Sequence, residues 1–190
     1  LDRAWGLDHG TWSVLAQMFP RADVPVVQLS LDGTRNPAGH YELAQQIKGL
    51  RDFGVLVLGS GNIVHNLRRT DRRMANEGFD WAIEFDTWIK ERIDAGDHRS
   101  VVEYEKQGRA ALLSVPTSEH YLPLLYALAL KDEKDSVRYF NEGATGGSIT
   151  NHDLINDVYG LAAEVLNKQP EEQREAAIQK TVDFLGERTE

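Results

Sequence analysis

The chain has 190 residues, of which 41% are hydrophobic and 27% are charged, the balance of an ordinary soluble globular protein. Its net charge of -9 repels phosphate backbones and so disfavours nucleic acid as a partner. The lack of cysteine excludes disulfides, thiolate nucleophiles and sulfur-bound zinc, so any metal must be held by histidine and carboxylate.

Neither a membrane span nor a signal segment is visible in the sequence. No apolar run reaches the about 20 residues that a membrane-spanning helix needs, and no basic-then-apolar stretch opens the chain. We therefore expect a cytoplasmic protein with no membrane partner. The chain begins at Leu1 rather than Met, as a fragment or a processed chain would.

Strands and helices alternate in the first part of the chain. Residues 24–31 and 55–58 have the apolar, β-branched composition of strands, and residues 39–50 between them have helical spacing. Strand-helix-strand order implies a right-handed parallel crossover. We therefore predict an α/β fold with a mixed, largely parallel sheet flanked by helices.

The middle of the chain is predicted to be mostly helical. Residues 79–93 form an amphipathic pattern whose aromatic residues belong to the core, and residues 101–111 continue as a polar helix with Gly108 as a weak point. Pro116 precedes a predicted helix that Thr117 or Ser118 caps and that is buried beyond its first turn.

A basic run occupies residues 68–73. The sequence favours a solvated helical face, salt-bridged to the acidic residues that follow, over an anion-binding site. Those acidic residues are Glu77, Asp80, Glu84 and Asp86.

The character of the chain changes after residue 150. Strands are predicted near residues 136–141 and after the glycine-rich turn at residues 143–150. Residues 151–190 carry two helical stripes separated by Gln169-Pro170-Glu171-Glu172. We predict an α/β domain over residues 1–150 and a C-terminal helical hairpin over residues 151–190.

With cysteine absent, the six histidines are the informative residues. His98 and His152 are predicted to lie on the surface, and His40 to have a structural or capping role. His9, His65 and His120 each lie at a loop-to-helix junction, and strand-helix topology brings such junctions to one edge of a sheet. Together they could bind a metal or act as acid and base beside one. Their spacing matches no compact metal motif, so the residues alone leave this open.

Three stretches in this order resemble the class III extradiol ring-cleaving dioxygenases, in the 4,5-DOPA dioxygenase-like branch. They are Trp5-Gly6-Leu7-Asp8-His9-Gly10-Thr11-Trp12, Gly59-Ser60-Gly61-Asn62-Ile63-Val64-His65-Asn66-Leu67 and Pro116-Thr117-Ser118-Glu119-His120-Tyr121-Leu122-Pro123-Leu124. The similarity covers residues 1 to about 150, and also includes His40-Tyr41-Glu42-Leu43 and Gly146-Gly147-Ser148-Ile149.

The resemblance implies one non-haem divalent metal, Zn²⁺ or Fe²⁺, with His65 and His120 at the metal site. The role of His65 stays open between ligand and acid-base group, and Glu119 is a fallback ligand. His9 is implied to contact the substrate or oxygen. The implied reaction is the cleavage of a catechol (DOPA-like) ring with dioxygen.

The resemblance also implies an earlier segment that supplies two further metal ligands, which this chain lacks. We therefore expect this chain to supply part of an active site that a second chain or a missing N-terminal segment completes. Two alternatives remain at this point, a catalytically inactive remnant that acts as a binding module and a metal-dependent hydrolase on the same scaffold.

Overall fold

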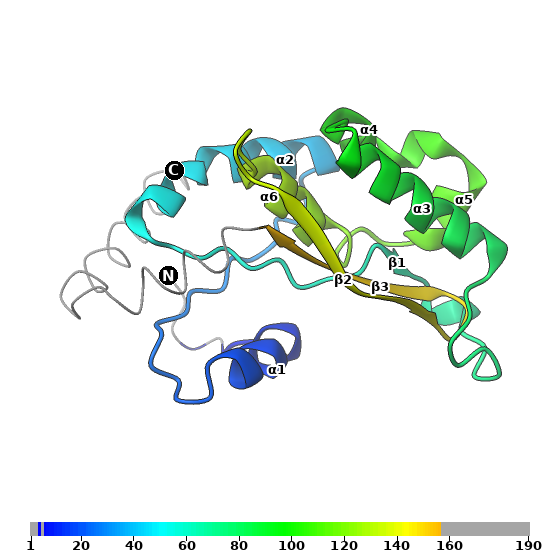
Figure 1. Ribbon diagram of the computed structural model, residues 1–190, viewed down its shortest axis with the longest axis horizontal. Helices are drawn as coiled ribbons and strands as arrows, with labels where there is room; N and C mark the ends of the chain where they lie inside the picture. Colours follow the sequence, from blue (N-terminus) through cyan, green and yellow to red (C-terminus); the bar gives the residue numbers. More distant parts are fainter. Residues whose placement is uncertain (1–3, 5, 157–190) are drawn as a thin grey trace. The chain divides into compact units, whose positions relative to one another are not determined.

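The computed structural model describes residues 4 and 6–156, which belong to two compact units (Figure 1). The first unit comprises Leu1–Leu31, Gly49–Val57 and Tyr159–Glu190, and the second comprises Asp32–Lys48 and Leu58–Val158. The second unit contains both His65 and His120, whereas His9 belongs to the first.

The described part of the first unit contains one α-helix, α1 (His9–Met18). Asp8 caps it by accepting a hydrogen bond of 2.9 Å from the Thr11 amide. The Gln28 side chain then ties the helix start to residues 24–31, because its Oε1 accepts from the Asp8 amide at 2.9 Å and from the Thr11 hydroxyl at 3.0 Å.

Residues 24–31 and 55–58, both predicted as strands, belong to no strand of the described chain. A strand exists only as part of a hydrogen-bonded ladder. Among the described residues, the backbone of residues 24–31 finds no partner, and that of residues 55–58 makes only the turn bond from Val55 N–H to Leu50 O, at 3.2 Å. Both segments have the apolar composition of strands, but neither pairs with a neighbouring strand among the described residues.

The sheet of the second unit has three strands in the order β1-β3-β2. These are β1 (Val64–His65), β2 (Val137–Thr145) and β3 (Ile149–Asn156), and both pairings are antiparallel. The predicted parallel sheet is therefore not confirmed. The described sheet is a hairpin extended by a two-residue strand, and the segments expected to run parallel lie outside it.

The turn between β2 and β3 depends on Gly146 and Gly147, whose φ angles are 60° and 76°. This left-handed region is readily adopted only by glycine. A Cβ on Gly147 would in addition lie 2.6 Å from the ring of Phe79. The hairpin therefore needs glycine at this point, in agreement with the glycine-rich turn predicted there.

β3 runs across residue 150, where the sequence suggested a change from domain to helical tail. Residues 151–156 belong to this strand. The rest of the predicted helical hairpin lies outside the described residues.

The helices lie where the sequence predicts them, but several begin or end at other residues than predicted. They are α2 (Pro37–Gln46), α3 (Asp80–Asp94), α4 (His98–Val102), α5 (Arg109–Ser114) and α6 (Leu122–Leu130), with the 3₁₀ turns η1 (Lys48–Phe53), η2 (Leu67–Arg69) and η3 (Tyr104–Gln107). The single helix predicted over residues 101–111 is broken at Gly108, whose φ is 82°. No helix in the described part of the chain is long and apolar enough to cross a membrane.

The core of the second unit lies between α3 and the sheet. Phe85 and Ile89 of α3 are buried together with Val64 of β1. The predicted core role of the aromatic residues is confirmed for Phe85, whereas Trp81 and Trp88 are partly buried and pack against the core. The Thr150 hydroxyl of β3 donates to the Asp86 carboxylate at 2.6 Å. Because Val64 pairs with Thr150 and His65 with Ile149, Val64 and Thr150 share the sheet face under α3, and His65 belongs to the opposite face.

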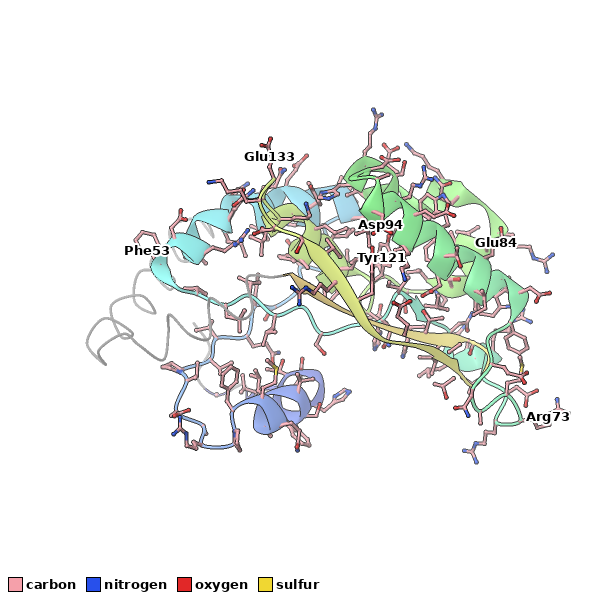
Figure 2. All side chains as sticks on the ribbon, viewed as in Figure 1. Phe53, Arg73, Glu84, Asp94, Tyr121 and Glu133 are labelled. Carbon is pink, nitrogen blue, oxygen red and sulfur yellow. The ribbon has the colours of Figure 1, made fainter. Side chains whose placement is uncertain are left out.

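Tyr121 anchors the segment before α6 to the core. Its ring is completely buried and its hydroxyl donates to the Val101 carbonyl oxygen at 2.8 Å. Figure 2 shows Tyr121 among the elements of the second unit, in contrast to the outlying Arg73. The residue next to His120 is therefore part of the core.

His98, predicted to be a surface residue, is partly buried because Tyr41 of α2 packs against it. The Tyr41 hydroxyl lies 2.8 Å from His98 Nδ1. Burial, and secondarily the charge of Lys131, lower the pKa of His98 below its ordinary value of 6.5.

His98 should make the stability of the fold depend on pH. The unfolded chain binds a proton at His98 more readily than the folded chain, so the free energy of unfolding should fall as the pH drops below about 6.5. In urea titrations between pH 7.5 and 5, we expect His98→Gln to lose less stability than the wild type. Parallel curves for the two proteins would contradict this role of His98.

Candidate functional site

His65 is held at the sheet by β1. Its ladder partner is Ile149 of β3, and the next residue, Asn66, is buried and fixed in three ways. The Asn66 amide donates to Ser148 O at 3.0 Å, its side-chain Nδ2 donates to Leu113 O at 2.6 Å, and its carbonyl accepts from the Ser148 hydroxyl at 2.8 Å. The backbone that carries His65 is therefore well defined.

His120 lies in the turn that precedes α6. The carbonyl of Ser118 accepts hydrogen bonds from the amides of Tyr121 and Leu122, both at 2.9 Å. The predicted side-chain cap at Thr117 or Ser118 is wrong, because α6 begins only at Leu122 and the residue before it makes no side-chain cap bond. His120 thus precedes the helix instead of lying in its first turn.

The two histidines are stacked on each other. Their ring centroids are 3.6 Å apart and their planes differ by only 11°. The structure thereby brings together two of the three residues that the sequence singled out, from motifs far apart in the chain.

The glycine-rich loop at residues 59–62, before β1, contacts the backbone of His120 and so holds the two histidine segments close together. The Asn62 amide donates to the His120 carbonyl at 2.8 Å, and a Cβ on Gly61 would collide with that same carbonyl oxygen. A Cβ on Gly59 would lie 2.7 Å from the carbonyl oxygen of Pro123. Glycine is needed at both positions because the two backbones touch.

Glu119 supplies a carboxylate beside the stack. Its Oε1 accepts from the Thr117 hydroxyl at 2.7 Å and lies 3.5 Å from His120 Nδ1. That separation lacks hydrogen-bond geometry, so the buried His120 Nδ1 has no hydrogen-bond partner among the described residues. Glu119 Oε1 is its nearest charged neighbour and forms an ion pair with it when the ring is protonated.

The ionisation of these groups favours a neutral His65 next to an anionic Glu119. Burial, and then the positive charge of His120, lower the pKa of His65, while Glu119 opposes this. Burial raises the pKa of Glu119, but the bonds from Thr117 and its own backbone, with the charge of His120, outweigh burial and leave that pKa lowered. His65 can therefore accept a proton near neutral pH.

The donor types suit a divalent transition metal, but the number and orientation of the donors fall short of a site. Histidine nitrogen and carboxylate oxygen are ordinary ligands of zinc and non-haem iron. The described residues contain no group of three side chains that could hold an ion. Moreover, two parallel rings 3.6 Å apart cannot both aim an in-plane lone pair at one ion about 2.1 Å away. In this arrangement the stacked pair does not fit a shared metal, whereas His120 Nδ1 with Glu119 fits part of a site.

The other histidines lie apart from the pair or have evident structural roles. His9 is exposed and is the first residue of α1. His40 is fully buried, with Nδ1 3.0 Å from the Tyr126 hydroxyl and Nε2 3.1 Å from the Asp32 carbonyl, which confirms the expected structural role. The side chain of His152 lies outside the described residues.

The basic run at residues 68–73 differs from its prediction. It forms η2 and a turn instead of a helical face, and within the described part of the chain Arg73 alone is ion-paired, to Asp71 at 2.6 Å. Among the described residues no carboxylate pairs with Arg68, Arg69 or Arg72. One expected partner, Asp86, is instead buried against Thr150.

Sequence reasoning missed the residues that position the pair. Asn62 acts through its backbone amide, and Asn66 through both its backbone and its side-chain Nδ2. The role of Thr117 is to hold Glu119. The signal that could have found them is the glycine-asparagine pattern around β1, since such residues permit close backbone approach and local side-chain bonding.

Comparisons with known proteins agree on one family. Residues 2–151 match the family described as the catalytic LigB subunit of aromatic ring-opening dioxygenase. A 4,5-DOPA dioxygenase extradiol of Escherichia coli (strain K12) is 39% identical over 155 residues, which cover 79% of this chain and 56% of that protein. The 4,5-DOPA dioxygenase extradiol of Beta vulgaris is 35% identical over 147 residues, covering 77% of this chain and 54% of that protein.

A solved structure supports the same grouping. The crystal structure of an uncharacterized protein from Escherichia coli K12 is similar with a TM-score of 0.69 and 37% identity, covering 80% of this chain and 63% of that one. The chain spans about half the length of the curated relatives that it matches. The match over residues 2–151 nevertheless covers most of the chain, which therefore belongs to the LigB family of aromatic ring-opening dioxygenases.

Proposed function

We propose that this chain supplies part of the active site of an extradiol dioxygenase, which opens a catechol (DOPA-like) ring with dioxygen. The observation that carries the proposal is the contact between His65 and His120, at 3.6 Å, in a member of the LigB family. Relatives that this chain matches bear the name 4,5-DOPA dioxygenase extradiol.

The two rings take different roles in the proposal, since they do not fit one ion as a stacked pair. His120 would hold a non-haem Zn²⁺ or Fe²⁺ ion through its buried Nδ1, which makes no hydrogen bond to a described residue, with Glu119 as a neighbouring carboxylate. The ion would supply Lewis acidity toward the diol oxygens. His65 would accept a proton from a substrate hydroxyl, because its lowered pKa leaves the ring neutral near pH 7. Because His9 belongs to the other unit, its contact with substrate or oxygen stays a prediction from the sequence resemblance.

The proposed site needs ligands beyond those described. Protein sites for such metals use at least three ligands. We propose that the remaining ligands come from polypeptide outside the described residues, either in the same chain or in a second one. The greater length of the relatives is in keeping with this.

The test is to measure bound metal and oxygen consumption on the native protein. We expect iron or zinc in the purified protein, and oxygen uptake with DOPA or another catechol together with the absorbance of a ring-opened product. Turnover of an ester or amide without oxygen would point to a hydrolase instead. If neither metal nor turnover is found in the native protein, the dioxygenase proposal fails and a binding module remains.

A further inference from the structure

Three arginines directly after the histidine strand carry charges that the described chain does not neutralise. Arg68, Arg69 and Arg72 are exposed and have no ion pair with a described residue. Arg73, by contrast, is bound by Asp71 through both carboxylate oxygens, with a shortest distance of 2.6 Å, and this lowers the pKa of Asp71 to about 2. One arginine of the run is therefore ion-paired, and the other three have no ion pair with a described residue.

The backbone that carries Arg68 and Arg69 is fixed relative to His65. Both residues belong to η2, which starts directly after the anchored Asn66, and the Arg69 amide donates to the Asn66 carbonyl at 3.0 Å. The Asp71 amide in turn donates to Gly146 O at 2.9 Å, so the far side of the segment is tied to the β2–β3 turn. The backbone positions of Arg68 and Arg69 are therefore well defined.

Arg68 and Arg69 also follow His65 closely in the chain, three and four residues later. Three residues of fully extended chain span at most about 11 Å, so the Cα atoms of His65 and Arg68 cannot lie farther apart than that. A guanidinium on its long, flexible stem can therefore reach a substituent on an aromatic ring that contacts His65.

These arginines are a local positive charge on an acidic protein. With a net charge of -9, the protein repels anions, so an anionic ligand needs local positive charge to bind. Guanidinium suits a carboxylate because its parallel N–H groups donate to both oxygens at once. A carboxylate-bearing ligand next to His65 would meet such groups in Arg68 and Arg69.

We propose that Arg68 and Arg69 select substrates by donating hydrogen bonds to a carboxylate on the side chain of the catechol. This rests on the proposed function, because it places the catechol at His65. The arginines take no part in ring opening. They discriminate a catechol that carries a side-chain carboxylate from a neutral one that lacks it.

Equilibrium binding separates this role from catalysis. Dihydrocaffeate, a catechol with a carboxylate side chain, and the neutral ethylcatechol are titrated by calorimetry without oxygen, so that no ring opening occurs. The wild type should prefer dihydrocaffeate. In Arg68→Gln or Arg69→Gln this preference should fall about tenfold, the loss expected for one charged hydrogen bond, while the affinity for ethylcatechol stays constant. Arg68→Lys should retain part of the preference, since it keeps the charge without the fork.

Arg99→Gln is the matched control. It makes the same change in net charge at an exposed residue of α4, whose ion pair with Glu103 is a loose 3.8 Å. Its preference should equal that of the wild type. Higher salt should reduce the preference of the wild type, because exposed charges are screened.

The proposal is overturned if the wild type does not prefer dihydrocaffeate, if neither ligand binds, or if both glutamine variants keep the full preference. An equal loss in Arg99→Gln would also overturn it, since the effect would then come from net charge. A failure to find ring opening in air counts against the proposed function alone, because the binding ratio is measured without turnover.

Discussion

Replacing His65 with Gln should lower kcat/KM for catechol cleavage by about 100-fold to 10,000-fold while leaving the fold intact, the range lost with a general acid-base group. The glutamine amide can still donate and accept hydrogen bonds, but it cannot take up a proton. Since His65 is partly exposed and faces away from the core, its replacement leaves no large cavity.

The pH profile gives this prediction a second readout. Because the pKa of His65 is lowered, the acidic limb of the wild-type kcat/KM profile should lie below pH 6.5, with activity falling as the ring becomes protonated. That limb should disappear in His65→Gln. His98→Gln is the matched control, because it makes the same chemical change at a histidine paired with Tyr41. Activity of His65→Gln close to that of the wild type would contradict the acid-base role.

Replacing Gly61 with Ala should destabilise the second unit by about 3 kcal/mol or more, the upper range for an overpacked site. The added methyl group would collide with the carbonyl oxygen of His120, and a backbone atom cannot rotate away as a side chain can. The loop must then move, which breaks the bond from the Asn62 amide to the same oxygen.

Gly143→Ala is the control for this substitution. A Cβ at Gly143, in the same unit, would meet nothing within 4 Å, so the free energy of unfolding should change little. Urea denaturation measures both variants. NMR then follows the ring protons of His65 and His120, whose mutual ring-current shifts should shrink in Gly61→Ala and persist in Gly143→Ala. A Gly61→Ala protein with wild-type stability and unchanged histidine signals would show that the loop does not set the stack.

Local patterns in the sequence predict the helices of this protein well. α3 follows its aromatic spacing, and Asp8 caps α1 as its position before the helix suggests. Such features depend on neighbours within one or two turns, which the sequence lists directly. The predicted start of α6 is less accurate, because Thr117 bonds to the side chain of Glu119 instead of capping the helix.

Local sequence patterns do not predict strand pairing or ion pairing, because the partners are distant in the chain. Residues 24–31 have the composition of a strand, yet composition does not say which backbone lies beside them. Asp86 was a plausible partner for the basic run, but its position on α3 turns it toward Thr150. The pairing of His65 with His120 was expected from the resemblance, whereas the stacked orientation depends on the backbone contact between Asn62 and His120.

The short length of β1 has a consequence for how the site persists in time. Only two residues of this strand are paired, and both pair with the first residues of β3. An opening of the β2–β3 hairpin at that end would break the ladder pairs of Val64 and His65 together, even while the helices stay folded. Such local unfolding needs less free energy than unfolding of the whole unit, so the bonds of Asn62 to His120 and of Asn66 to Leu113 would then have to hold the histidine pair.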